Sequence, residues 1–208
     1  MPDAENVSDQ GAFSSLPGLD SQTLRSQIEG REYLATMKLL QTKRSPIDWT
    51  GPLLYSIHRD VFGEHFPTLA GQNRHSEVNF GRRAAAPPEQ IDSLMEQLVL
   101  SMRENLSEVL SLRIEDEERL SRAFLSAAAD HGEMLRIHPF IDGNGRWARM
   151  ATNAFLTDCG YPPGTIIRAR DKREYITNLD RCMDKNAPGD LAHQFLEGYV
   201  REQNRRRL

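Results

Sequence analysis

Apolar residues recur at helical spacing along most of the chain, and short stretches rich in glycine, proline or polar residues separate the runs. The run from Ile91 to Leu106 shows the pattern well, because an apolar residue occurs every three or four positions and Pro87-Pro88 precede it. Further runs of this kind begin near residues 22, 53, 120, 147, 175 and 191. The pattern predicts an all-α chain.

Composition adds limits on the class of protein. The 208 residues suit one domain, and 38% hydrophobic with 27% charged residues is typical of a soluble globular chain. A net charge of −4 gives no support for nucleic-acid binding, and no apolar run approaches the ~20 residues that cross a membrane. Two cysteines and no signal-peptide core fit a reducing compartment, so we expect a cytoplasmic protein, although secretion into a host cell would leave no readable mark.

One stretch between two helical runs, residues 138–149 with the sequence HPFIDGNGRWAR, concentrates chemistry. Gly143 and Gly145 allow positive φ and close backbone approach, and the helix that follows offers unpaired N–H groups to an anion. Arg146 and Arg149 stand in the first turns of that helix, where cations are unfavourable unless an anion lies nearby. This conflict predicts a bound phosphate group.

Two further residues of the stretch complete a chemical set. His138 titrates near neutral pH and can serve as a general base. Asp142 is a hard oxygen ligand of the kind that holds Mg²⁺ beside phosphates. Together with the glycines and arginines they predict a site for phosphoryl or nucleotidyl transfer, without saying which phosphorus is attacked.

The stretch resembles the signature of the Fic family, His-Pro-Phe-x-(Asp/Glu)-Gly-Asn-Gly-Arg-x-x-Arg, at every fixed position. The resemblance extends over about residues 22–200 and implies an all-α fold of about eight helices with a short β-hairpin flap beside the site. It also implies transfer of AMP from ATP to a hydroxyl group of a target protein, which is called AMPylation. In that reading His138 deprotonates the hydroxyl group and Asp142 holds Mg²⁺.

The same resemblance assigns the nucleotide-binding residues. Asn144 and the backbone around Gly143 and Gly145 would hold the α- and β-phosphates. Arg146 would help to bind the triphosphate, and Arg149 would contact the γ-phosphate.

A second segment resembles the inhibitory helix of many Fic proteins, (Ser/Thr)-x-x-x-Glu-(Gly/Asn). Glu29-Gly30 match its end, whereas Arg25 stands at the Ser/Thr position with Ser26 next to it. The resemblance implies that Glu29 pairs with Arg149 and blocks the γ-phosphate position. Glu197-Gly198 form a second pair of this kind near the C-terminus, which we rank below Glu29.

A short alternating run, residues 76–82, ends in glycine and reads as a strand. In the family a β-hairpin flap lies at this place in the chain and pairs with the target segment. The resemblance therefore assigns flap and target-positioning roles to Val78, Asn79 and Phe80.

The chain accordingly divides into four parts: a flexible leader (1–20), an inhibitory helix region (21–42), the Fic domain (43–200) and a basic C-terminal tail (201–208).

The expected partners are ATP, Mg²⁺ and a target protein, for which the chain itself is one candidate. A homodimer is also a candidate. Three alternatives stay open: removal of AMP, with Glu29 orienting a water; another phosphate-containing donor; and a nucleotide-binding regulator without catalysis. Gly145 argues against the kinase-like branch of the family, which carries Lys there.

Overall fold

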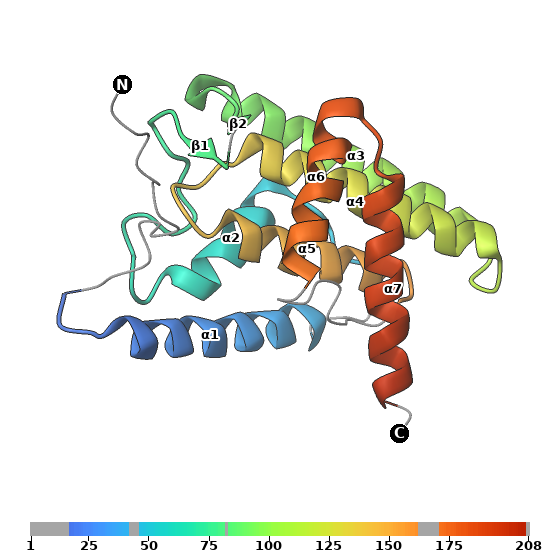
Figure 1. Ribbon diagram of the computed structural model, residues 1–208, viewed down its shortest axis with the longest axis horizontal. Coiled ribbons are helices and arrows are strands. Elements are labelled where there is room, and N and C mark those ends of the chain that lie inside the picture. The colour runs from blue at the N-terminus through green and yellow to red at the C-terminus, as the bar shows by residue number, and fades with distance from the viewer. Residues whose placement is uncertain (1–16, 42–45, 82, 162–170, 207–208) are drawn as a thin grey trace.

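The computed structural model describes residues 17–41, 46–81, 83–161 and 171–206. This part of the chain is almost entirely helical and carries one small hairpin (Figure 1). The elements are α1 (Ser21–Gln41), α2 (Gly51–Phe62), β1 (Asn79–Phe80), β2 (Arg83–Ala84), a 3₁₀ turn (Pro88–Gln90), α3 (Ile91–Ser111), α4 (Glu117–Ile137), α5 (Asn144–Asp158), α6 (Lys172–Lys185) and α7 (Gly189–Arg206). The all-α prediction with a short hairpin is confirmed.

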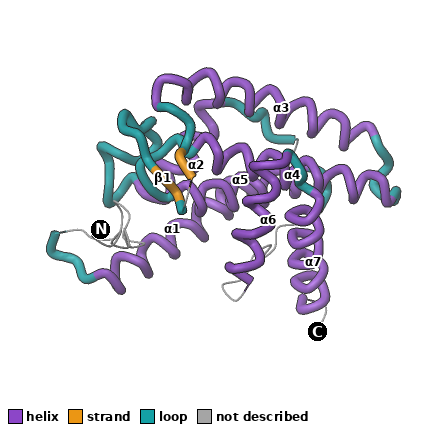
Figure 2. The backbone as a smooth tube through the Cα atoms, turned by 45° about the horizontal axis from the view of Figure 1, so that its top comes forward, coloured by secondary structure: helices purple, strands orange, loops and turns teal. Residues whose placement is uncertain are grey.

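Helix α4 is the centre of the packing. It contacts α3, α5, α6 and α7, so it has apolar neighbours on several sides. Helix α1 packs against α2 and α5, and Figure 1 shows it running along one side of the molecule. The tube in Figure 2 shows the hairpin, in orange, toward one end of the molecule among the loops.

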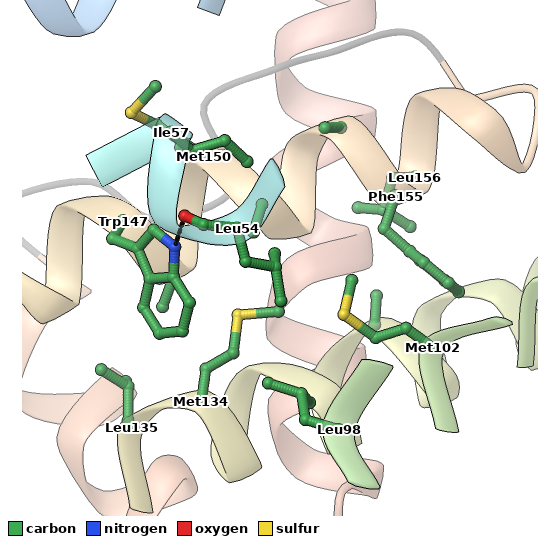
Figure 3. Close-up of a cluster of buried hydrophobic side chains, with 14 of the residues drawn as sticks. Leu54, Ile57, Leu98, Met102, Met134, Leu135, Trp147, Met150, Phe155 and Leu156 are labelled. Atoms are coloured by element: carbon green, nitrogen blue, oxygen red, sulfur yellow. Dashed lines mark hydrogen bonds between the residues drawn. The ribbon is translucent and has the colours of Figure 1, made fainter. Parts of the chain in front are cut away.

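The core fixes α5 in place. Trp147 of α5 is 1% exposed, and its Nε1 donates a hydrogen bond of 2.8 Å to the carbonyl oxygen of Leu54 in α2 (Figure 3). Met134 of α4 and Leu98 of α3 lie in the same buried cluster. Burying one such side chain stabilises the fold by about 1.5–3 kcal/mol, so three neighbouring helices hold the start of α5 in place.

The hairpin is short and antiparallel. Asn79 lies opposite Ala84, and Phe80 lies opposite Arg83. Gly81, in the turn, has a φ of 60°, which favours glycine. The predicted strand residues Asn79 and Phe80 thus form β1, and Val78 directly precedes it.

The ends of the chain modify the predicted boundaries. Most of the predicted leader, residues 1–16, lies outside the described residues. Asp20 caps α1, because its carboxylate accepts from the N–H groups of Gln22 and Thr23 at 3.0 and 2.9 Å. Residues 201–206 of the expected tail continue α7. Within the described residues no helix is long and apolar enough to cross a bilayer.

Candidate active site

The signature forms the connection between α4 and α5. Helix α4 ends at Ile137, and His138 adopts a left-handed backbone conformation with φ 52°. Gly143, with φ 78°, stands immediately before α5. A Cβ atom at Gly143 would lie 2.5 Å from the ring of Phe62, so both the backbone conformation and the packing require glycine. The prediction of positive φ is therefore right for Gly143 and wrong for Gly145, which is helical.

The start of α5 has the geometry that suits an anion. The first N–H groups of the helix have no partner within it and point toward the loop, where the dipole favours negative charge. Asn144 does not offer its side chain to a ligand, because its Oδ1 accepts from the N–H of Phe140 (3.1 Å) and its Nδ2 donates to the Phe140 carbonyl (2.9 Å). The predicted phosphate contact of Asn144 is thus limited to its backbone, while its buried amide holds the loop in shape.

The imidazole of His138 is held in its neutral form. Its Nδ1 donates to the carbonyl oxygen of Leu135 at 3.3 Å, which leaves the lone pair on Nε2 for an incoming proton. The ring stacks on Phe80 of the flap, with centroids 4.8 Å apart and an interplanar angle of 5°. Burial lowers the pKa of His138 to about 4, with a smaller lowering contribution from Arg74.

A second histidine shapes the same loop. His58 of α2 is fully buried; its Nδ1 accepts from the N–H of Gly71 at 2.9 Å, so its Nε2 donates to the carbonyl oxygen of Asp142 at 2.9 Å. The ring stacks on Phe140 with centroids 3.8 Å apart. His58 therefore has a structural role, because it holds the loop of residues 138–143 against α2.

Asp142 directly precedes Gly143 in this loop, and its side chain is half-buried. One carboxylate oxygen accepts from the N–H of Gly143 at 2.6 Å, which orients the group beside the helix start. Among the described residues no cluster of three or more His, Cys, Asp or Glu side chains could hold a metal alone. One carboxylate beside a helix N-terminus nevertheless fits Mg²⁺, which binds through one or two carboxylates plus substrate phosphates.

The two signature arginines differ in their surroundings. The Nε of Arg146 lies 3.5 Å from a carboxylate oxygen of Glu32 in α1, and both side chains are about 30% exposed (31% and 28%). Arg149 forms no ion pair with any described carboxylate. It lies near His131, whose pKa falls to about 3 through burial first and through the charge of Arg149 second. Its guanidinium is therefore available to an anionic ligand.

The predicted Glu29–Arg149 contact is absent from the described structure. Leu24 and Ile28 form the face of α1 that is buried in the core, and Glu29 lies outside this face and is exposed. Glu32 follows Ile28 by four residues and lies over the same face, so this carboxylate reaches the signature instead. Ser26 and Gly30, the other predicted inhibitory positions, are exposed as well.

The lower-ranked Glu-Gly pair lies on α7. Glu197 is half-exposed and pairs with Arg201 (3.4 Å) and His193 (3.3 Å) on its own helix. Its carboxylate therefore stabilises α7 locally and makes no ion pair with a signature arginine in the described residues.

The flap closes one side of the site. A cavity of about 620 Å³ lies between the flap and α6, and Phe80, which stacks on His138, is part of its wall. The cavity is mainly apolar and is lined by Phe80, Gly81, Arg83, Ile176, Leu179, Asp180 and Met183.

Arg83 of β2 fixes the flap to α6. Its Nε lies 2.9 Å from a carboxylate oxygen of Asp180, and its two terminal nitrogens contact the carboxylate of Asp184 one turn further along α6. Sequence reasoning missed Arg83, Glu32 and His58 as site residues. Their partners lie far away in the chain, so the sequence carries no local signal for these contacts.

Comparison with known proteins agrees with this geometry. The model of the Fic/DOC family matches residues 49–156, which include α2, the hairpin, the signature loop and most of α5. The protein adenylyltransferase Fic of Nematostella vectensis is 32% identical over 129 residues, and the protein adenylyltransferase fic-1 of Caenorhabditis elegans is 32% identical over 126. These matches cover 62% and 61% of the chain but only 27% and 22% of those relatives.

Solved structures share the fold. Fic-1 (residues 134–508) from C. elegans superposes with a TM-score of 0.68 at 20% identity, covering 89% of this chain and 51% of that one. The BepC protein of Bartonella tribocorum, a VirB-translocated effector with bound AMPPNP, gives 0.64 at 18% identity and covers 86% and 87%. The family match spans half of the chain and contains the whole signature. The chain belongs to the Fic/DOC family.

Proposed function

We propose that the protein transfers AMP from ATP to a hydroxyl side chain of a protein. One observation carries the proposal: a neutral histidine with a free Nε2 lies beside the open N-terminus of α5, in one rigid loop. The relatives named above are protein adenylyltransferases. Bound AMPPNP in one structural neighbour and ADP in another support a nucleotide at this place.

The elements around the loop suit a nucleotide. The phosphates would lie on the backbone of Gly143 to Gly145, with Arg146 and Arg149 on their charge. The apolar cavity between the flap and α6 would take the base, because Phe80 in its wall lies next to His138. Asp142 would hold Mg²⁺, which neutralises phosphate charge when it is bound.

The reaction then follows from the positions of these groups. A target segment pairs with the edge of the flap and presents a hydroxyl group to His138. Nε2 takes the hydroxyl proton while the hydroxyl oxygen forms a bond to the α-phosphorus. The bond from the α-phosphorus to the bridging oxygen breaks, and pyrophosphate leaves. The products are the AMP ester, pyrophosphate and a protonated histidine.

The test is self-modification with ATP labelled at the α-phosphate, beside ATP labelled at the γ-phosphate. We expect label from the α position only. Label from the γ position would indicate phosphoryl transfer instead. Absence of both labels, with a purified nucleotide-binding protein, would favour removal of AMP or a regulatory role and would count against the proposal.

The low pKa of His138 gives a second prediction. Because the imidazole resists protonation, it should stay neutral and competent well below pH 6.5 and become protonated only near pH 4. Histidine NMR signals of the nucleotide-free protein, assigned with His138→Asn, measure this directly. The same shift means that the folded state loses stability as pH falls from about 6.5 toward 4, since the unfolded chain binds the proton more readily. Titration of His138 at or above pH 6.5 would contradict the buried position.

A homodimer stays a prediction. Sedimentation of the intact chain over a range of concentrations tests it.

A further inference from the structure

Arg74 lies in the irregular segment between α2 and the hairpin, yet it is among the most buried charged residues, with 4% exposure. Its Nε donates to the carbonyl oxygen of His138 at 2.7 Å, and a terminal nitrogen donates to that of Ile137 at 3.3 Å. Other donors reach the carbonyl oxygens of Ser76 (2.7 Å) and Ala86. One guanidinium thus joins four backbone carbonyls from three segments.

The partners of Arg74 are unusual for a buried cation. No described carboxylate forms an ion pair with it, and Glu77 acts on it only at longer range. Burial lowers the pKa of Arg74, but arginine keeps its charge because its ordinary value is so high. The negative end of the α4 dipole, at the carbonyls of Ile137 and His138, compensates this charge. Only a fork of several N–H donors can reach all these oxygens together.

The first two acceptors belong to the catalytic loop. His138 is one of only two non-glycine residues with positive φ among the described residues, and such a conformation costs energy unless its surroundings fix it. Arg74 binds the carbonyl of His138 itself, and the backbone N–H of Arg74 donates to the carbonyl of Pro139 at 2.9 Å. These bonds hold the backbone that carries the imidazole.

The other two acceptors lie at the two ends of the flap segment. Ser76 precedes β1 and Ala86 follows β2, so the guanidinium closes the base of the hairpin. The N–H of Ala86 also donates to the carbonyl of Arg136 in the last turn of α4, at 3.2 Å. Figure 1 shows the hairpin beside the connection from α4 to α5. The flap and the catalytic loop therefore share one anchor.

We infer that Arg74 is a positioning residue that locks the target-binding flap and the backbone of His138 into one unit. The inference rests on the proposed function for its catalytic consequence, but the coupling itself is a property of the fold. A target hydroxyl held by the flap then meets Nε2 at a fixed distance, and small misplacements of reacting groups cost large factors in rate.

The experiment compares Arg74→Lys with Arg119→Lys. Arg119 also donates to backbone carbonyls, those of Leu112 (2.7 Å) and Cys159 (3.0 Å), but it lies near the other end of α4, about 28 Å along the helix from His138. Lysine keeps the charge and loses the fork. We expect Arg74→Lys to lower kcat for AMP transfer about tenfold. The KM for ATP should change less than about threefold, because the proposed phosphate site at the start of α5 does not include the carbonyls that Arg74 binds. Arg119→Lys should leave both values unchanged per folded molecule.

Hydrogen exchange supplies a readout that needs no activity. In Arg74→Lys the amides of Ala85, Ala86 and His138 should all exchange faster, and in Arg119→Lys they should not. In the wild-type protein, which requires no variant to fold, the amides of Ala85 and His138 should open with the same free energy. A flap that opens independently in the wild type, or full kcat in Arg74→Lys, would overturn the inference. An inactive wild type with coupled exchange would reject the proposed function and leave the coupling intact.

Discussion

His138→Ala is expected to reduce AMP transfer by about 10²–10⁴-fold, the usual contribution of a positioned general base. The nucleotide should still bind, because the α5 start and the two arginines do not depend on the imidazole. The measurements are the rate of α-label transfer and the dissociation constant of a non-hydrolysable ATP analogue, which should change less than about threefold.

A matched control separates this effect from a general loss of histidine. His193 on α7 is 73% exposed and pairs with Glu197 on its own helix. His193→Ala should transfer AMP at the wild-type rate. If His138→Ala transferred AMP at a rate within about tenfold of the wild type, another group would take the proton. His138 would then not be the general base.

The signature could be predicted well because its information is local. Twelve consecutive residues contain the residue that caps one helix, a loop and the start of the next helix. The amphipathic runs likewise predicted the helices, since α4 and α5 bury their apolar faces as the spacing requires. Gly143 fits the same logic, because a positive φ before a helix favours glycine.

The contacts that hold the loop could not be predicted in this way. Asn144 belongs to the signature, yet both hydrogen bonds of its side-chain amide are made with the backbone of Phe140. Only the three-dimensional structure shows this. Arg74 stands in a segment without periodic pattern, and its acceptor His138 lies 64 positions away. Backbone carbonyls carry no residue identity, so the sequence contains no record of these bonds.

The predicted inhibitory helix shows a different reason why a contact could not be predicted from the sequence. The family resemblance identifies Glu29 as the inhibitory residue because Gly30 follows it. The side of a helix that faces the protein, however, depends on how the helix is rotated about its own axis. Leu24 and Ile28 settle that rotation through the core, and this places Glu32 against Arg146. Glu29 and Glu32 are three residues apart, so they differ by only about 60° around the axis. Inhibition by Glu29 stays a prediction, and the two carboxylates can be compared directly.

Glu32→Gln is expected to raise AMP transfer roughly two- to fivefold at ATP concentrations below saturation. The Nε of Arg146 lies 3.5 Å from the Glu32 carboxylate, and a partly exposed ion pair of this length opposes phosphate binding by about 0.5–1 kcal/mol. Glutamine keeps the shape and helix propensity of glutamate, which makes loss of charge the only large change. The affinity for a non-hydrolysable ATP analogue should rise by the same factor as transfer.

Glu29→Gln is the matched variant, on the same helix and equally conservative. In the described conformation its carboxylate is exposed and makes no ion pair with a described residue, so transfer should change less than about twofold. A larger rise in Glu29→Gln than in Glu32→Gln would show that α1 turns by about 60° in solution and forms the contact with Arg149 that the family resemblance implies. If neither variant changes transfer or nucleotide affinity, α1 supports the core through Leu24 and Ile28 and does not restrain the active site.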